Sequence, residues 1–156
     1  MMTIRKIALS ILLAAGILAS IHSATAQTPG TVVTCLYPWC VNHVQIVQGA
    51  SGTPVAKIDW NQIQLAKKLT GATILWVLAG APDYEFRSDS VVITGANAAG
   101  SSAQFPVRER TASRFALDDV NTNDLTYEYQ VRVYRKDSPP GAAPVAVSGS
   151  IVNAYN

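Results

Sequence analysis

The chain lacks most of the side chains on which metal and redox centres depend. Outside its N-terminal leader it has one histidine, His43, and no methionine. A blue-copper centre needs two histidines and a cysteine, commonly with an axial methionine, so the sequence excludes a cupredoxin. Cys35, Cys40 and His43 would give a zinc ion only three ligands, and two thiols in an oxidising compartment are expected to pair instead. We therefore predict no metal centre of this kind and no cofactor.

The residues of nucleophilic catalysis are equally scarce. His43 would be the only base for a serine triad, and no Gly-x-Ser-x-Gly elbow occurs. Four residues separate Cys35 from Cys40, whereas a thiol oxidoreductase motif has two. The one pair of adjacent carboxylates, Asp118 and Asp119, falls in a predicted turn, where we expect it to be solvated. We predict that the protein is not an enzyme, because an active site would have to gather Asp118, Asp119 and His43.

The chain also lacks a surplus of charge. Its 12 Lys and Arg face 10 Asp and Glu, but Arg5 and Lys6 lie in the leader, so the remainder carries 10 of each sign. A neutral domain without a basic run has no electrostatic attraction for nucleic acid or for an anionic membrane. We predict that it binds neither.

Residues 1–26 have the pattern of a secretory signal peptide. Arg5 and Lys6 precede an apolar run from Ile7 to Ile21, and Ala24-Thr25-Ala26 offers the small-x-small cleavage pattern. The run is short for a membrane span, so a retained anchor is the less favoured alternative. We predict cleavage after Ala26 and a secreted or periplasmic protein without a transmembrane span.

The remaining residues are enough for one domain with a sizeable core. Residues 27–30, with Pro29-Gly30, predict a flexible start, and residues 31–156 predict a single domain. Its clearest signal is the period-two alternation over Leu125–Arg135, which is typical of a strand with one buried face.

Other segments also favour strands. Those with the best patterns are Val41–Gln48, Val55–Trp60, Thr73–Ala79 and Val145–Val152. Thr73–Ala79 is apolar throughout, so we expect burial on both faces or an outer face that meets a partner. Residues 61–69 fit a strand or a short helix, and residues 95–102 fit a loop. Seven to nine short strands predict an all-β, immunoglobulin-like antiparallel sandwich of two sheets, with a closed barrel as the alternative.

The two cysteines lie in Thr34-Cys35-Leu36-Tyr37-Pro38-Trp39-Cys40. An even cysteine count in an exported chain predicts a disulfide, and Pro38 favours the turn that would close a small hairpin. Leu36, Tyr37, Pro38 and Trp39 would then form a pre-ordered recognition loop, because rigid aromatic side chains lose little entropy on binding. The favoured interpretation, however, is that Trp39 folds back and covers one end of the core.

Asp119, Asn121 and Asn123 place oxygen ligands at alternate positions, as the start of a calcium loop does. Two features speak against calcium. The sixth position is Asp124 instead of glycine, and the twelfth is Gln130, which cannot chelate through two oxygens. An Asx-rich turn that caps the following strand is the favoured interpretation.

The second half of the chain carries a series of short motifs made of apolar, aromatic and Asn or Asp residues. They are Ile74-x-Trp76, Phe86 followed by Val91 to Ile93, Asp119-x-Asn121, Tyr127-x-Tyr129 and Ile151-Val152-Asn153. This series, over residues 73–153, resembles small bacterial β-sandwich proteins of the DP-EP type. The Asp-Pro of that pattern is missing, since Ser148-Gly149-Ser150 stands in its place. The resemblance implies an immunoglobulin-like fold and no catalytic residues.

The favoured function is an exported, non-enzymatic binding or structural module that contacts a protein or another component of the cell envelope. The alternative is a small enzyme inhibitor that presents the disulfide loop. Self-association through edge strands or through the apolar Thr73–Ala79 run is a further expectation.

Overall fold

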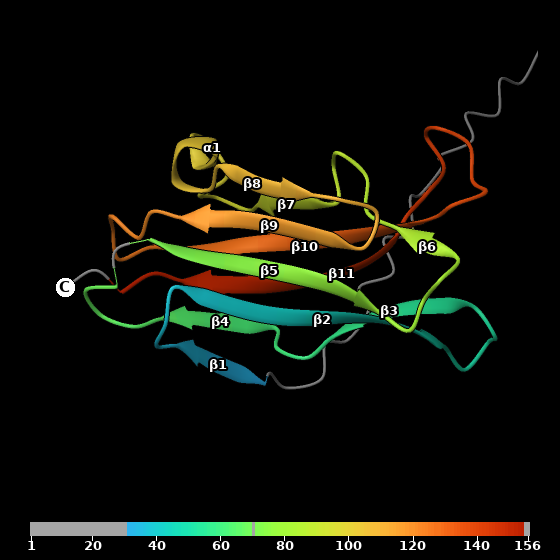
Figure 1. Cartoon of the computed structure of the whole chain (residues 1–156), viewed down its shortest axis with the longest axis horizontal. Helices are drawn as coiled ribbons and strands as arrows, with labels where there is room; N and C mark the ends of the chain where they lie inside the picture. The colour runs from blue at the N-terminus through green and yellow to red at the C-terminus, as the bar shows by residue number, and fades with distance from the viewer. Residues whose placement is uncertain (1–30, 70, 155–156) are drawn as a thin grey trace, which may run out of the picture.

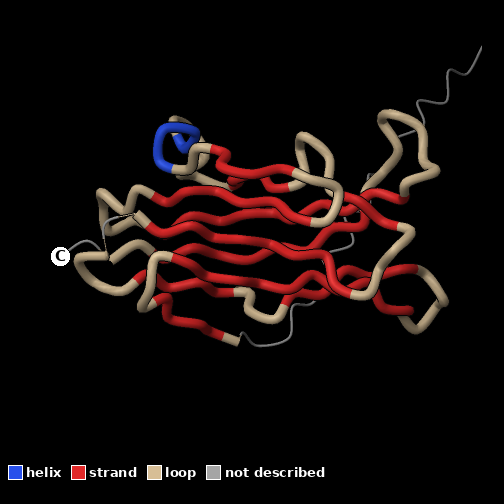
Figure 2. The backbone as a smooth tube through the Cα atoms, in the orientation of Figure 1, coloured by secondary structure: helices blue, strands red, loops and turns tan. Residues whose placement is uncertain are grey.

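Two β-sheets packed face to face make up the described part of the chain (Figures 1 and 2). The computed structural model describes residues 31–69 and 71–154, so the predicted signal peptide and the start at residues 27–30 lie outside it. Sheet A contains β1 (Val32–Cys35), β4 (Gln62–Leu65), β11 (Val145–Val152), β10 (Thr126–Arg135), β6 (Tyr84–Glu85) and β7 (Val91–Thr94). Sheet B contains β3 (Pro54–Ile58), β2 (Trp39–Gln48), β5 (Ala72–Ala79), β9 (Arg114–Asp119) and β8 (Val107–Arg110).

The predicted all-β, immunoglobulin-like two-sheet sandwich is confirmed. The strand order in sheet A is β1-β4-β11-β10, and both β6 and β7 pair with the far side of β10. The strand order in sheet B is β3-β2-β5-β9-β8. Most neighbours are antiparallel, but β1–β4, β4–β11 and β2–β5 run parallel. The described residues form eleven strands instead of seven to nine. The excess comes from strands of two to four residues, which are too short to show a period in the sequence.

β10 is an inner strand of sheet A, as its alternation predicts. Tyr127, Tyr129, Val131 and Val133 point into the core and are buried. Across the sandwich the Tyr129 ring meets the buried indole of Trp76 edge to face, with ring centroids 5.3 Å apart. This aromatic pair joins the middles of the two sheets.

β5 is the middle strand of sheet B. Ile74 and Trp76 face the core, whereas Thr73 and Leu75 face outward and are buried nevertheless. Burial on both faces is thus confirmed for this part of the apolar run, because the neighbouring strands β2 and β9 flank it closely on both sides.

Packing determines the secondary structure of the two segments, residues 61–69 and 95–102, whose sequence patterns did not identify a strand. Residues 61–69 contain the strand β4, whose Ile63 and Leu65 are fully buried, so the helical alternative is wrong. The predicted loop at residues 95–102 runs into a single-turn helix, α1 (Ser101–Gln104), which leads to the buried Phe105. No helix in residues 31–69 and 71–154 has the length and apolar character to cross a bilayer.

The cysteine loop does not form the hairpin that its spacing predicts. Cys35 ends β1 in sheet A, and Cys40 lies in β2 of sheet B. β1 pairs with β4, and β2 pairs with β3 and β5, so the two cysteine-bearing strands are not hydrogen-bonded to each other. The segment between them is a crossover from one sheet to the other, and its disulfide ties the sheets together at one end of the sandwich.

Candidate recognition site

The predicted disulfide between Cys35 and Cys40 is confirmed. The two Cα atoms are 5.7 Å apart, and both cysteines are buried as part of the core. The residues between them point the other way: Leu36 is 67% exposed and Tyr37 is 74% exposed. We call residues Leu36–Trp39 the aromatic loop. Its ends are fixed in the core while its apolar side chains face solvent.

Trp39 is also on the outside. Its side chain is 48% exposed, and it is not among the residues that pack into the core. The favoured prediction that Trp39 covers the end of the core is therefore wrong. Trp39 stands at the start of β2, where alternation sends Cys40 inward and the two flanking side chains outward.

A row of polar contacts supports Trp39 across the outer face of sheet B. The guanidinium of Arg108 lies over the indole ring, 5.2 Å from its centroid. Arg108 Nη1 is 3.3 Å from Asp118 Oδ1, which also accepts a 2.7 Å hydrogen bond from Thr73 Oγ1. The backbone N–H of Thr73 donates to the Pro38 carbonyl at 2.7 Å, which ties the loop to β5.

Nothing in the amino-acid pattern indicates that Arg108 belongs to this site. Its distance from Trp39 in the chain means that only the strand order β2-β5-β9-β8 brings the two together. The exposed apolar side chain of Val41 in β2 extends the same face. The three charged residues of β8 indicate an exposed strand, but not which aromatic ring one of them meets.

An open hollow lies elsewhere, beside the wet face of β10. It has a volume of about 800 Å³ and is open to solvent. Arg87, Arg132, Tyr134 and the loop at residues 138–144 line it. Each arginine is already neutralised, since Arg87 Nε is 2.9 Å from Glu85 and Arg132 Nη1 is 3.6 Å from Asp89.

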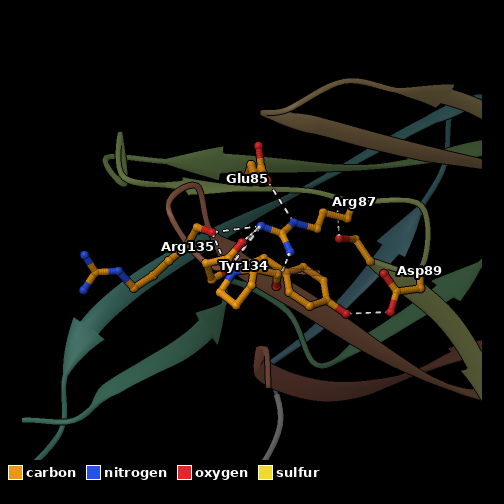
Figure 3. A network of polar contacts seen from close by, with 8 residues as sticks. Glu85, Arg87, Asp89, Tyr134 and Arg135 are labelled. Atoms are coloured by element: carbon orange, nitrogen blue, oxygen red, sulfur yellow. Dashed lines mark hydrogen bonds and ion pairs between the residues drawn. The ribbon is translucent and has the colours of Figure 1, made fainter. Parts of the chain in front are cut away.

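Arg87 is a clamp within this hollow. Its Nη2 donates to the carbonyls of Arg135 and Ser138 at 3.0 Å each, and its guanidinium lies 4.8 Å from the centre of the Tyr134 ring. Figure 3 shows this side chain reaching from the β6–β7 connection to the turn that follows β10. Because its donors are used within the chain, Arg87 organises the turn and presents no free cation to a ligand.

The adjoining Tyr134 hydroxyl donates a 2.5 Å hydrogen bond to Asp89 Oδ2. This bond holds the pKa of the Asp89 carboxyl below its usual value, with a further contribution from Arg132. Burial raises the pKa of Tyr134, and the neighbouring carboxylate adds to the effect. At neutral pH the pair is therefore a phenol donating to a carboxylate.

The three residues that resemble a calcium loop, Asp119, Asn121 and Asn123, lie partly in the core and partly in a turn. Asp119 is fully buried, and its Oδ1 accepts from Gln104 Nε2 at 2.7 Å, from the Asn121 N–H at 2.8 Å and from Asn153 Nδ2 at 3.2 Å. Burial raises the pKa of this carboxyl, although the three hydrogen bonds act against the rise. Together these residues join α1, the β9–β10 connection and the end of β11.

The two asparagines of the motif take part in different bonds. Asn121 Nδ2 donates to the Leu69 carbonyl at 2.7 Å, and Asn123 Nδ2 donates to the Tyr127 hydroxyl at 2.9 Å. Asn123 Oδ1 accepts from the Leu125 N–H at 3.2 Å, as in an Asx turn at the entry of β10. Within residues 31–69 and 71–154, no three His, Cys, Asp or Glu side chains are grouped so that they could hold a metal ion.

The three candidates for catalysis do not share a pocket. His43 Nδ1 is 2.7 Å from Asp59 Oδ2 at the β2–β3 side of sheet B. Asp118 faces solvent beside Arg108, and Asp119 points into the core. On β5, the partner of His43 is Val77 and that of Asp118 is Thr73, so these two are also four residues apart along the strand.

Comparison with known proteins identifies no family for this chain. No protein-family model and no curated protein matches the chain. Among solved structures, the chain is similar to a cysteine protease inhibitor from Entamoeba histolytica, with a TM-score of 0.37 and 10% sequence identity. The alignment covers 73% of this chain and 95% of the inhibitor. A likeness at this level carries no function from one protein to the other.

Proposed function

We propose that the protein is an exported, non-enzymatic binding module whose aromatic loop contacts a protein partner. The observation that carries the proposal is the exposure of Leu36, Tyr37 and Trp39 on a loop whose two ends are buried and cross-linked. A soluble domain gains nothing from exposing three large apolar side chains at one place unless another surface covers them. The disulfide limits the freedom that the loop loses when a partner binds.

The composition of the site favours a protein over a saccharide. Trp, Tyr and Arg are the residues that most often dominate the energy of protein–protein contacts, and Tyr37, Trp39 and Arg108 supply one of each. A sugar ring would need an open aromatic face, but Arg108 already lies over the indole of Trp39. The guanidinium also gives the apolar patch a charged rim, with Asp118 behind it.

The non-enzymatic part of the proposal is supported by the separation of His43, Asp118 and Asp119. General acid–base and nucleophilic catalysis both need their groups within hydrogen-bond reach of one reacting atom. The export part rests on the leader sequence and on a disulfide that an oxidising compartment would preserve. Kinship with proteins of the DP-EP type is proposed on the motifs of residues 73–153.

The test is differential capture from the cell envelope of the source organism. Immobilised wild-type protein should retain a partner that the Tyr37→Ala, Trp39→Ala double variant loses by at least about tenfold, because hot-spot truncations cost 2 kcal/mol or more. Trp39→Phe keeps an aromatic ring and should retain most binding. Arg108→Ala should also weaken capture. Arg114→Ala is its matched control, since Arg114 is a similarly exposed arginine at the start of β9, away from Trp39.

Reduction of the disulfide should weaken the same interaction, because the loop becomes more flexible. If the double variant captures everything that the wild type does, with melting temperatures unchanged, the aromatic loop is not the contact surface.

A small enzyme inhibitor is the second candidate, favoured by the same fixed ends of the loop. An inhibitor of this kind needs a convex segment that keeps its shape inside an active site, and the short Cys35–Cys40 ring meets that need. Purified protein tested against proteases and glycosidases separates the two functions. Inhibition that Tyr37→Ala abolishes would support the inhibitor, whereas envelope capture without inhibition supports the binding module.

A further inference from the structure

β1 leaves one side of its backbone unused. It is the outermost strand of sheet A and pairs only with β4 among the described residues (Figure 1). The carbonyls of Thr31 and Cys35 accept from the N–H groups of Gln62 and Ala66. In a parallel ladder alternate residues bond to the same neighbour, so the intervening residues of β1 direct their N–H and C=O groups away from β4. These residues are Val32 and Thr34.

The outer strands of sheet B are protected against pairing in a way that β1 is not. β8 carries charge at three of its four positions, Arg108, Glu109 and Arg110, and β3 begins at Pro54 and carries Lys57. Charge and proline are the usual means of keeping a sheet edge from pairing with another chain. β1 reads Val-Val-Thr-Cys, has no charge and exposes 53% of Val32.

β7 is also uncharged, but its edge is less accessible. Its four residues, Val91–Thr94, are buried or half-buried, and none is exposed. β1 has two exposed residues out of four. Accessible polar backbone and an uncharged, apolar surface therefore coincide at β1.

We propose that β1 is a dimerisation strand, which pairs antiparallel with β1 of a second copy of this chain. The pattern of outward groups is self-complementary. When Val33 lies opposite Val33 of the second copy, Val32 of each chain lies opposite Thr34 of the other, and each such pair exchanges both N–H···O bonds. A closed two-fold contact of this kind uses the same surface on both partners.

Charge selects this orientation. Lys67 and Lys68 follow β4 beside the C-terminal end of β1, both are exposed, and neither has an ion-pair partner in the described part of the chain. Asp59 lies at the other end of β1, where its carbonyl accepts from Thr31 Oγ1 and its side chain is partly exposed beside His43. Antiparallel pairing puts the lysines of one chain at the same end of the joined strands as Asp59 of the other, about three strand spacings away, where their opposite charges attract. Parallel pairing would put the lysines of both chains at the same end.

The contact is expected to be weak, because four residues bury less surface than the roughly 1,200 Å² of a stable interface. It is independent of the partner proposed above, since β1 pairs through its backbone and the aromatic loop begins beyond its end. A dimer would carry two aromatic loops at opposite ends of the joined strands.

Sedimentation of the purified, oxidised protein from about 5 μM to about 500 μM tests the proposal, because a weak dimer forms by mass action. The wild type should shift from monomer to dimer within this range. Thr34→Pro should stay monomeric, since it removes an outward N–H while proline is tolerated where that group faces solvent. Thr34→Val is the matched control, because it keeps the N–H and should dimerise like the wild type.

A second variant avoids any change inside the strand. Lys67→Glu, Lys68→Glu places acid at the same end of the joined strands as Asp59 of the second copy, and it should weaken the dimer at least several-fold at low salt. Circular dichroism checks that each variant is folded. A wild type that remains monomeric throughout overturns the proposal, as does a folded Thr34→Pro or Lys67→Glu, Lys68→Glu variant that dimerises like the wild type. Tyr37→Ala, Trp39→Ala should dimerise normally, which separates this result from that of the proposed function.

Discussion

At the scale of single residues, the most consequential side chain is the buried carboxyl of Asp119. It has no cationic partner in the described residues, and amide groups surround its Oδ1. A buried charge without a counter-ion is costly, and amide donors offset only part of that cost. Asp119 therefore connects three parts of the fold at the expense of stability at neutral pH.

The pH dependence of unfolding should show this cost. Burial raises the pKa of Asp119 in the folded state above its unfolded value of 3.8, so the folded chain holds this proton more tightly. The free energy of unfolding should then fall as pH rises from about 4 through the raised pKa, and stay lower above it. Asp119→Asn should remove this fall, which urea denaturation between pH 4 and pH 7 would measure.

Asp89 supplies the control for that prediction, because its pKa is shifted in the opposite direction. Its folded pKa is lowered by the Tyr134 hydroxyl, so its contribution is present above 3.8 and is lost at lower pH. Tyr134→Phe should therefore lower stability by a constant amount above pH 4 and by less at lower pH, and it should leave the slope above pH 4 intact. If Asp119→Asn keeps the wild-type slope above pH 4, the carboxyl is not the group that titrates.

Arg87 offers a second test at this scale. Arg87→Lys keeps the charge but loses the planar set of donors that reaches Glu85, Arg135 and Ser138. We expect a loss of about 1 kcal/mol in the free energy of unfolding, with faster amide exchange confined to residues 136–144. Arg135→Lys is the control, because its ion pair with Asp137 is exposed and worth little. Equal exchange rates in the two variants would contradict the clamp.

At the scale of strands, period-two patterns predicted those that are long and half-buried. β2, β10 and β11 occupy the expected residues within one or two positions, since one face of each meets the core and the other meets water. The shortest strands, such as β6, have too few residues to show an alternation. Whether neighbours run parallel also could not be predicted, because β2–β5 pairing depends on contacts far apart in the chain.

β11 contains a residue whose small size is a requirement of packing. A Cβ atom at Gly149 would lie 2.5 Å from the Tyr129 hydroxyl and 2.6 Å from the Asn61 carbonyl oxygen. Gly149→Ala should therefore lower the free energy of unfolding by about 1–3 kcal/mol, as overpacking does. Chemical denaturation measures the loss.

Combining Gly149→Ala with Tyr129→Phe should recover only part of the free energy of unfolding that Gly149→Ala loses. The second change removes the hydroxyl, but the Asn61 carbonyl belongs to the backbone and stays in place. Full recovery would show that the carbonyl moves aside, and an unchanged stability of Gly149→Ala alone would show that the strand shifts to make room.

At the scale of the whole molecule, the disulfide links two sheets that the core already holds together. Closing so short a ring is worth about 2 kcal/mol in the chain-entropy account. Cys35→Ser, Cys40→Ser should therefore fold and lose about this amount. Reduced wild-type protein should reach the same stability, and the double variant should not respond to reductant. An unchanged stability after complete reduction would contradict the prediction.

The sequence predicted this bond but not its place in the fold. Cysteine count and spacing are local facts, whereas the crossover between sheets follows from β1 pairing with β4 and β2 with β5. The same holds for the candidate site. Tyr37 and Trp39 could be predicted as a loop pair, but the exposure of Trp39 depends on its position at the sheet B end of that crossover and on Arg108 from a distant strand.

The position of β11 has a consequence for the order of folding. It is the last strand in the chain, yet it lies between β4 and β10 inside sheet A. Before it is added, β4 has only the short β1 as a neighbour, and the edge of β10 is open. A chain emerging from a ribosome therefore cannot complete its core until residues 145–152 have been made. Under the export proposed above, a chain whose residues 145–152 have not yet been made has no complete core that threading would have to unfold.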